Sequence, residues 1–172
     1  MNNTIILIPS RLAASRLPNK PLLKVNNLSI INHVYEKAKQ SKIGDVYVAT
    51  GDKEIFNDVK QNGGNCILTE KEHNSGTDRI FEAFEKLSLK NVDYIINLQG
   101  DEPVIDINDI NKLHEKTLQN KTEISTLACK IFDDRLFKNE NIVKVTTEQK
   151  LSDQNSSKAK AFSRKVLEND YK

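Results

Sequence analysis

An apolar segment near the N-terminus, followed by a cationic loop, constrains this sequence more than any other feature. Residues 4–8 read T-I-I-L-I, which is typical of a buried strand in a parallel sheet, and Pro9 is predicted to end it. The loop beyond it carries Arg11, Arg16 and Lys20. Because ligands of open α/β sheets bind beyond the carboxyl ends of strands, this loop predicts a polyanion site, most simply for a nucleoside triphosphate. A solvated basic turn is the alternative.

Strands and helices are predicted to alternate along most of the chain, which favours a three-layer α/β/α fold with a mostly parallel sheet. The predicted helices span about residues 30–40, 53–61, 77–87 and 107–118, with a helical turn at 133–138. Further strands are predicted at about 46–49, 65–68, 92–98, 124–131 and 142–147. Residues 148–160 are expected to form a loop, and 161–164 a last strand remnant.

Size and composition predict one domain. The 172 residues are 37% hydrophobic and 29% charged, as in folded globular proteins. A net charge of +2 favours neither nucleic acid nor a membrane as partner, and no apolar run approaches the roughly 18 residues of a membrane span, so we expect a cytoplasmic protein. Cys66 and Cys129 lie far apart in apolar runs and are expected to be buried thiols, with no zinc site or disulfide.

Two later segments also carry polar groups at the ends of predicted strands or the start of a helix. Residues 73–79 read H-N-S-G-T-D-R, where Ser75 or Thr77 can cap a helix whose N-terminus also suits an anion. Residues 97–103 read N-L-Q-G-D-E-P and place Asp101 just after a strand. Magnesium prefers one or two carboxylates together with phosphate oxygens and water, so Asp101 is a candidate ligand. An ordinary turn acid is the alternative. The three histidines have no metal-site spacing; His73 is expected in a polar loop, and His33 and His114 on helix surfaces.

The loop R-L-A-A-S-R-L-P-N-K-P at residues 11–21, taken with these two segments in this order, closely resembles the sugar-acid cytidylyltransferases. Within them it is most similar to the 3-deoxy-D-manno-octulosonate (Kdo) cytidylyltransferases, also called CMP-Kdo synthetases. The resemblance runs from about residue 4 to about residue 164. It implies a Rossmann-like nucleotide-diphospho-sugar transferase fold, Mg²⁺ as cofactor, and transfer of CMP from CTP to Kdo for lipopolysaccharide biosynthesis.

The resemblance also implies residue roles at the matching positions. Arg11 and Lys20 are expected to hold the CTP phosphates, and Asp101 to bind the metal. The expected catalytic residues are Arg11, Arg16, Lys20 and Asp101. The expected nucleotide-binding residues are Pro9, Ser10, Arg11, Lys20, Thr50, Asp52, Ser75, Arg79, Gln99 and Gly100. Arg16 and Gln99 are expected to contact the sugar acid.

The resemblance weakens toward the C-terminus. Family members continue well beyond the F-S-R segment at residues 162–164, bringing further acceptor-binding residues, a second metal-binding aspartate and the strands of a dimer arm. We therefore expect the nucleotidyltransferase domain to occupy residues 1–172, with 148–172 as loop and dimer-arm remnant, and the protein to be a portion of a longer homodimeric enzyme. A natural short form, a synthetase for neuraminic acids, and a non-catalytic CTP-binding module are the alternatives.

Overall fold

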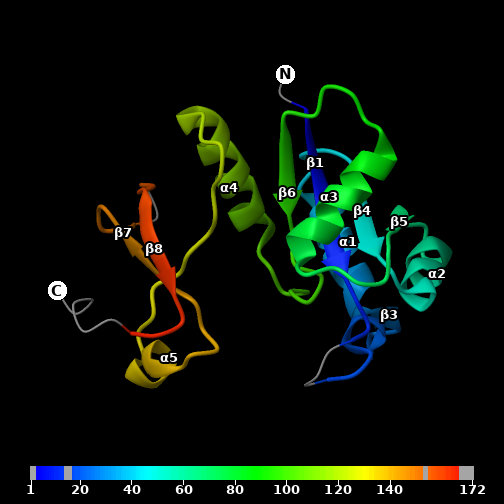
Figure 1. The fold of residues 1–172 in the computed structure, drawn as a ribbon, viewed down its shortest axis with the longest axis horizontal. Helices are drawn as coiled ribbons and strands as arrows, with labels where there is room; N and C mark the ends of the chain where they lie inside the picture. The colour runs from blue at the N-terminus through cyan, green and yellow to red at the C-terminus, as the bar shows by residue number, and fades with distance from the viewer. Residues whose placement is uncertain (1–2, 14–16, 153–154, 167–172) are drawn as a thin grey trace. The chain divides into compact units, whose positions relative to one another are not determined.

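The computed structural model describes residues 3–13, 17–152 and 155–166 of the chain. They divide into two compact units, residues 1–115 and 116–172, which are described separately. The first unit contains a four-stranded parallel sheet in the order β5-β4-β1-β6, which can be followed in Figure 1. Its strands are β1 (Thr4–Ser10), β4 (Val46–Thr50), β5 (Cys66–Leu68) and β6 (Tyr94–Asn97).

Strand β1 lies between two neighbours, and its residues are buried throughout. It pairs with β4 from Ile6 to Ser10, as in Ile8 opposite Val48. It pairs with β6 from Thr4 to Leu7. Pro9 does not end the strand, as the sequence predicted; the strand continues to Ser10. Proline lacks a donor N–H, and it is tolerated here because this end of the strand has a paired neighbour on one side only.

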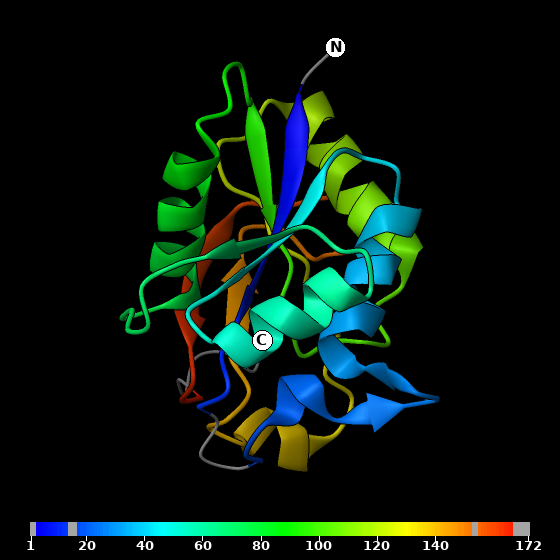
Figure 2. The ribbon, with the colours of Figure 1, turned by 90° about the vertical axis from the view of Figure 1, so that its right-hand side faces the viewer.

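Helices cover both faces of this sheet, as Figure 2 shows, so the predicted three-layer arrangement is confirmed. On one face, α1 (Ile30–Gln40) and α2 (Lys53–Gln61) pack on Ile6 and Ile8, together with Ile110 of α4 (Ile107–Asn120). On the other face, α3 (Gly76–Leu87) packs Ile80 against Ile5 and Leu7. Alternate residues of β1 thus enter different cores, which explains the continuous apolar run.

The helices that connect the strands of the first unit agree closely with the predicted helices. Helices α1 and α2 have the predicted bounds, and Ser29 caps α1 by accepting a hydrogen bond from the backbone N–H of Asn32. Between β1 and α1 lie a 3-10 helix, η1 (Lys20–Leu22), and a small antiparallel pair, β2 (Lys24–Val25) and β3 (Leu28–Ser29). None of the helices in the described ranges combines the length and apolar character needed to cross a membrane.

The second unit contains α5 (Asp134–Lys138) and the antiparallel pair β7 (Lys144–Thr147) and β8 (Ala159–Ser163). The predicted strand at 124–131 was wrong: these residues form no strand, and Ile124 is 91% exposed. The expected loop at 148–160 was too long, because β8 begins at Ala159. Cys129 is exposed, so its predicted burial was wrong, whereas Cys66 is buried as predicted. The organisation as one domain stays a prediction.

Candidate functional site

A cavity of about 620 Å³ lies at the carboxyl ends of β1 and β6 and the start of α3, within the size range of small-molecule sites. Three segments far apart in the sequence meet there: the loop after β1, the loop that begins α3, and the loop after β6. Nine of the residues expected to serve the site line it, namely Pro9, Ser10, Arg11, Lys20, Ser75, Arg79, Gln99, Gly100 and Asp101. Arg16 lies outside the described residues.

Lys20 and Asp101 join the first and third of these segments. The Nζ atom of Lys20, on η1, lies 2.8 Å from Oδ2 of Asp101, on the loop after β6. The Lys20 side chain is 32% exposed and that of Asp101 58%. A pair this open to water adds little to stability, so both groups remain accessible to a charged ligand.

Asp52, two residues beyond the end of β4, makes a hydrogen bond to the cationic loop. Its Oδ2 atom accepts a hydrogen bond from the backbone N–H of Leu12 at 2.8 Å, and thereby fixes the start of the cationic loop. The side chain of Thr50 is buried, and its Oγ1 accepts from the N–H of Asp52 at 3.1 Å. Neither residue is among the described residues that line the cavity. Their predicted contact with the nucleotide stays a prediction, and the hydrogen bond that the structure shows ties Asp52 to the loop.

Ser75 caps the start of α3, as the sequence predicted. Ser75 Oγ accepts from the Asp78 N–H at 3.1 Å and donates to Asp78 Oδ2 at 2.8 Å. Gly76, the next residue, lies against the ring of Pro9, where an added Cβ would come within 3.3 Å of Pro9 Cγ. The helix N-terminus is therefore held directly beside the end of β1, and its positive dipole end borders the cavity.

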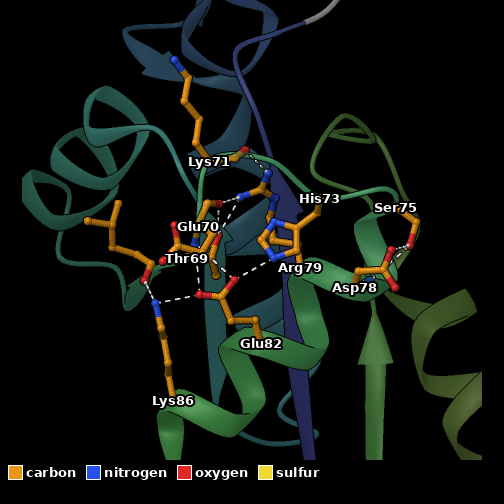
Figure 3. A network of polar contacts seen from close by, with 10 residues as sticks. Thr69, Glu70, Lys71, His73, Ser75, Asp78, Arg79, Glu82 and Lys86 are labelled. Atoms are coloured by element: carbon orange, nitrogen blue, oxygen red, sulfur yellow. Dashed lines mark hydrogen bonds and ion pairs between the residues drawn. The ribbon is translucent and has the colours of Figure 1, made fainter.

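Arg79 is buried beside the cavity, with 4% of its surface exposed. Its Nη1 donates to Thr69 Oγ1 at 2.6 Å and to the Glu70 carbonyl at 2.9 Å, and its Nη2 donates to the Lys71 carbonyl at 2.9 Å (Figure 3). Burial lowers the pKa of Arg79, while the carboxylates of Asp52 and Glu82 oppose that shift. The observed contacts clamp the segment after β5, and the predicted nucleotide contact of Arg79 stays a prediction.

The loop after β6 approaches the end of β1 very closely. A Cβ added to Gly100 would lie 2.8 Å from the carbonyl oxygen of Pro9, so only glycine fits there without movement. Gln99 lies beside it, and its Nε2 donates to Asn97 Oδ1 at 3.0 Å. The Ser10 hydroxyl is buried and has no hydrogen-bond partner in the described part of the chain. Gly100, Gln99 and Ser10 thus contribute backbone and polar groups to the lining of the cavity.

The sequence reasoning missed a network around Glu82. This residue of α3 pairs with Lys86 at 2.7 Å and with His73 Nε2 at 2.6 Å, and its carboxylate also accepts from the Glu70 N–H (Figure 3). Glu82 and Lys86 have the i,i+4 spacing of a helix ion pair, which can be recognised in the sequence. No local pattern in the sequence predicts the contact with His73. His73, expected to be a polar loop residue, has only 12% of its side chain exposed.

The other two histidines also make contacts. His33 Nε2 lies 2.8 Å from the carbonyl of Val25, and its partly exposed position agrees with the helix surface predicted for it. His114 Nε2 lies 3.0 Å from Thr4 Oγ1, so it is partly buried against the start of β1. No group of three or more histidine, cysteine, aspartate or glutamate side chains suited to a metal ion occurs within the described ranges.

Comparison with known proteins agrees with this geometry. A protein related in sequence, the 3-deoxy-manno-octulosonate cytidylyltransferase of Thermodesulfovibrio yellowstonii, is 46% identical over 148 residues, which cover 83% of this chain and 58% of that protein. The enzyme of the same name from Nitrobacter winogradskyi is 42% identical over 144 residues, 83% of this chain and 57% of that protein. The chain thus spans less than two thirds of the length of these relatives.

Solved structures give the same picture. A CMP:2-keto-3-deoxy-manno-octonic acid synthetase complexed with CTP superimposes with a TM-score of 0.78 and 34% identity, over 95% of this chain and 65% of that one. A cytidylyltransferase from Leptospira borgpetersenii gives a TM-score of 0.58 at 26% identity, over 72% and 52% of the two chains. The sequence model of the cytidylyltransferase family matches residues 5–172. The chain therefore belongs to the cytidylyltransferase family.

Proposed function

We propose that this chain binds CTP and provides the nucleotide-activating part of a 3-deoxy-D-manno-octulosonate cytidylyltransferase. The observation that carries the proposal is the convergence of Arg11, Lys20 and Asp101 on one cavity at the carboxyl ends of parallel strands. The relatives with 40–46% identity, which bear the name of that enzyme, support the choice of nucleotide and acceptor.

The charges around the cavity suit a triphosphate. Arg11 offers a planar guanidinium that matches phosphate oxygens, and Lys20 offers a compact ammonium group. The Ser10 hydroxyl, which has no hydrogen-bond partner among the described residues, and the start of α3 at Gly76 add uncharged donors beside them. Arg16, in the same loop but outside the described residues, belongs to the proposal through its place in the sequence motif, as does Gln99 as a contact of the acceptor.

Magnesium fits this site as a shared ion. The Asp101 carboxylate already attracts a cation, the ammonium group of Lys20 at 2.8 Å, and it is exposed enough to meet a hydrated ion. A single protein carboxylate suffices, because Mg²⁺ commonly keeps several waters and takes its remaining ligands from nucleotide phosphates. When bound, the ion would neutralise phosphate charge beside Asp101.

The proposed reaction is a displacement at the α-phosphorus of CTP. The anomeric hydroxyl oxygen of Kdo forms a bond to the α-phosphorus, the bond from that phosphorus to the bridging oxygen of the β-phosphate breaks, and pyrophosphate leaves with the electron pair. The hydroxyl proton passes to solvent. The chain contributes positioning and fixed positive charge: Arg11 and Lys20 hold the phosphates, and the start of α3 faces the same cavity.

The experiment measures CTP affinity by calorimetry with and without Mg²⁺, and then pyrophosphate release with CTP, Mg²⁺ and Kdo, each omitted in turn. We expect Mg²⁺ to tighten CTP binding by roughly tenfold or more in the unmodified chain and to have no such effect in Asp101→Asn. Asp133→Asn, at an aspartate of the second unit that pairs with Arg135, is the matched control.

The outcomes separate the two parts of the proposal. Release of pyrophosphate that requires all three components establishes the transfer to Kdo. Binding of CTP without release shows that this chain holds the nucleotide but does not complete the transfer by itself, as expected of a CTP-binding portion. An equal effect of Mg²⁺ on the unmodified chain and on Asp101→Asn excludes Asp101 as the metal ligand, and absence of CTP binding refutes the nucleotide site.

A further inference from the structure

His73 lines the cavity, and the proposed function has not used its chemistry. It lies in the loop that precedes α3 and lines both the main cavity and a smaller hollow of about 310 Å³. Figure 3 shows its ring directed toward the Glu82 carboxylate, with Nε2 at 2.6 Å from Oε2. Its other nitrogen, Nδ1, is buried and has no hydrogen-bond partner among the described residues.

Glu82 determines which nitrogen of the ring carries the proton. Burial raises the pKa of Glu82, but hydrogen bonds from Lys86, the Glu70 N–H and His73 outweigh it, so that the pKa lies below its usual value and the group is a carboxylate at neutral pH. A carboxylate only accepts hydrogen bonds, and the one from His73 must therefore be Nε2–H. In the neutral ring Nδ1 is then an acceptor with a free lone pair.

A buried acceptor without a partner costs free energy, which a ligand in the cavity can recover. The charges indicate which part of the ligand this is. The smaller hollow that His73 borders also has Glu72 and Asp78 in its wall, and these acids repel phosphate. Arg11 and Lys20, which attract phosphate, line the main cavity but not this hollow. The uncharged nucleoside of the ligand is the part that suits the His73 side.

We propose that His73 is a nucleoside-recognition residue, in which Nδ1 accepts a hydrogen bond from an N–H or O–H group of the bound nucleotide and Glu82 holds the ring in place through the hydrogen bond from Nε2–H. A cytidine nucleotide has such donors in the amino group of its base and in its ribose hydroxyls. This inference rests on the proposed CTP site and adds to it a residue that distinguishes among nucleosides.

The test uses substitutions that separate the two ring nitrogens. His73→Gln places an amide near the position of Nε2 and removes the acceptor at Nδ1, whereas His73→Asn places an amide oxygen near Nδ1. The control is Lys86→Met, which removes another partner of Glu82 at a residue that does not line the cavity. Calorimetry on the full 172-residue chain compares CTP, UTP, 2′-deoxy-CTP and 3′-deoxy-CTP, and circular dichroism verifies the fold of each variant.

We expect His73→Gln to weaken CTP binding roughly tenfold, and His73→Asn to restore most of that loss. If the base amino group is the donor, His73→Gln leaves UTP affinity unchanged; if a ribose hydroxyl is the donor, it leaves the affinity of one deoxy analogue unchanged. If His73→Gln weakens the binding of all four nucleotides equally, or leaves CTP affinity unchanged, the inference is overturned while the CTP site stands. Failure of the unmodified chain to bind CTP overturns both.

Discussion

Replacing Arg79 with lysine tests whether this residue is chiefly a structural clamp. The guanidinium makes three hydrogen bonds, to Thr69 Oγ1 and to the carbonyls of Glu70 and Lys71, from a position that is 4% exposed. Lysine keeps the positive charge and most of the apolar stem, but it has a single nitrogen where arginine uses two. At least the bond to Lys71 is lost, and the remaining bonds lose the fixed geometry of the guanidinium.

The expected loss of stability follows from these contacts. A hydrogen bond to a charged group contributes about 1.5–3 kcal/mol, and an acceptor left buried without a partner costs about 1–3 kcal/mol. The loss of one or two of the three bonds therefore predicts a decrease of roughly 2–4 kcal/mol in the free energy of unfolding. Domains of this size commonly have a total stability of about 5–15 kcal/mol, so the decrease should be easy to measure.

Urea unfolding followed by circular dichroism measures this decrease, with Arg135→Lys as the matched control. Arg135 has 91% of its side chain exposed and pairs with Asp133, so the same substitution there should change stability by less than about 0.5 kcal/mol. If Arg79→Lys unfolds within about 0.5 kcal/mol of the unmodified chain, the clamp does not stabilise the fold and the reasoning fails.

Two further predictions concern ionisable groups. Because the folded-state pKa of Glu82 lies below the ordinary value of 4.5, its contribution to stability is present above that pH and is lost as pH falls through the folded pKa. Urea unfolding between roughly pH 5 and pH 3 should therefore show a shallower loss of stability in Glu82→Gln, and an unchanged slope would contradict this. Burial raises the pKa of the Cys66 thiol to about 12, while Cys129 is exposed. A thiol reagent should label Cys129 alone until the chain is denatured, and rapid labelling of a Cys129→Ser variant would refute the protection of Cys66.

The fold of the first unit was largely predictable because its local signals agree with its tertiary structure. Residues 5–8 of β1 are all apolar because their side chains enter two cores, and Ser75 is the N-cap of α3 that the sequence predicted. The prediction failed where apolar composition was taken for burial. Residues 124–131 contain strand-forming side chains, yet they pair with no strand in the described part of the chain, and β propensity stabilises a strand only through such neighbours.

The site was predictable to the extent that its residues lie in recognisable segments. The rule that ligands bind beyond the carboxyl ends of parallel strands predicted a polyanion site at the loop of Arg11 and Lys20 and made Asp101 a candidate ligand, and the family resemblance assigned all three to one site. The link from Asp52 to the N–H of Leu12 was not predictable, since it joins residues 40 positions apart. The same holds for His73 and Glu82, whose contact depends on how a loop folds back over α3.

The contacts of Pro9 with two glycines have a consequence for how this site can be changed. A side chain at Gly76 would press on the ring of Pro9, and one at Gly100 on its carbonyl oxygen. The three segments are consequently fitted to one another and are not interchangeable parts. A chimera that takes one of them from a distant homologue should fold poorly unless the other two come with it, so we expect variation in the three segments to be inherited as a set.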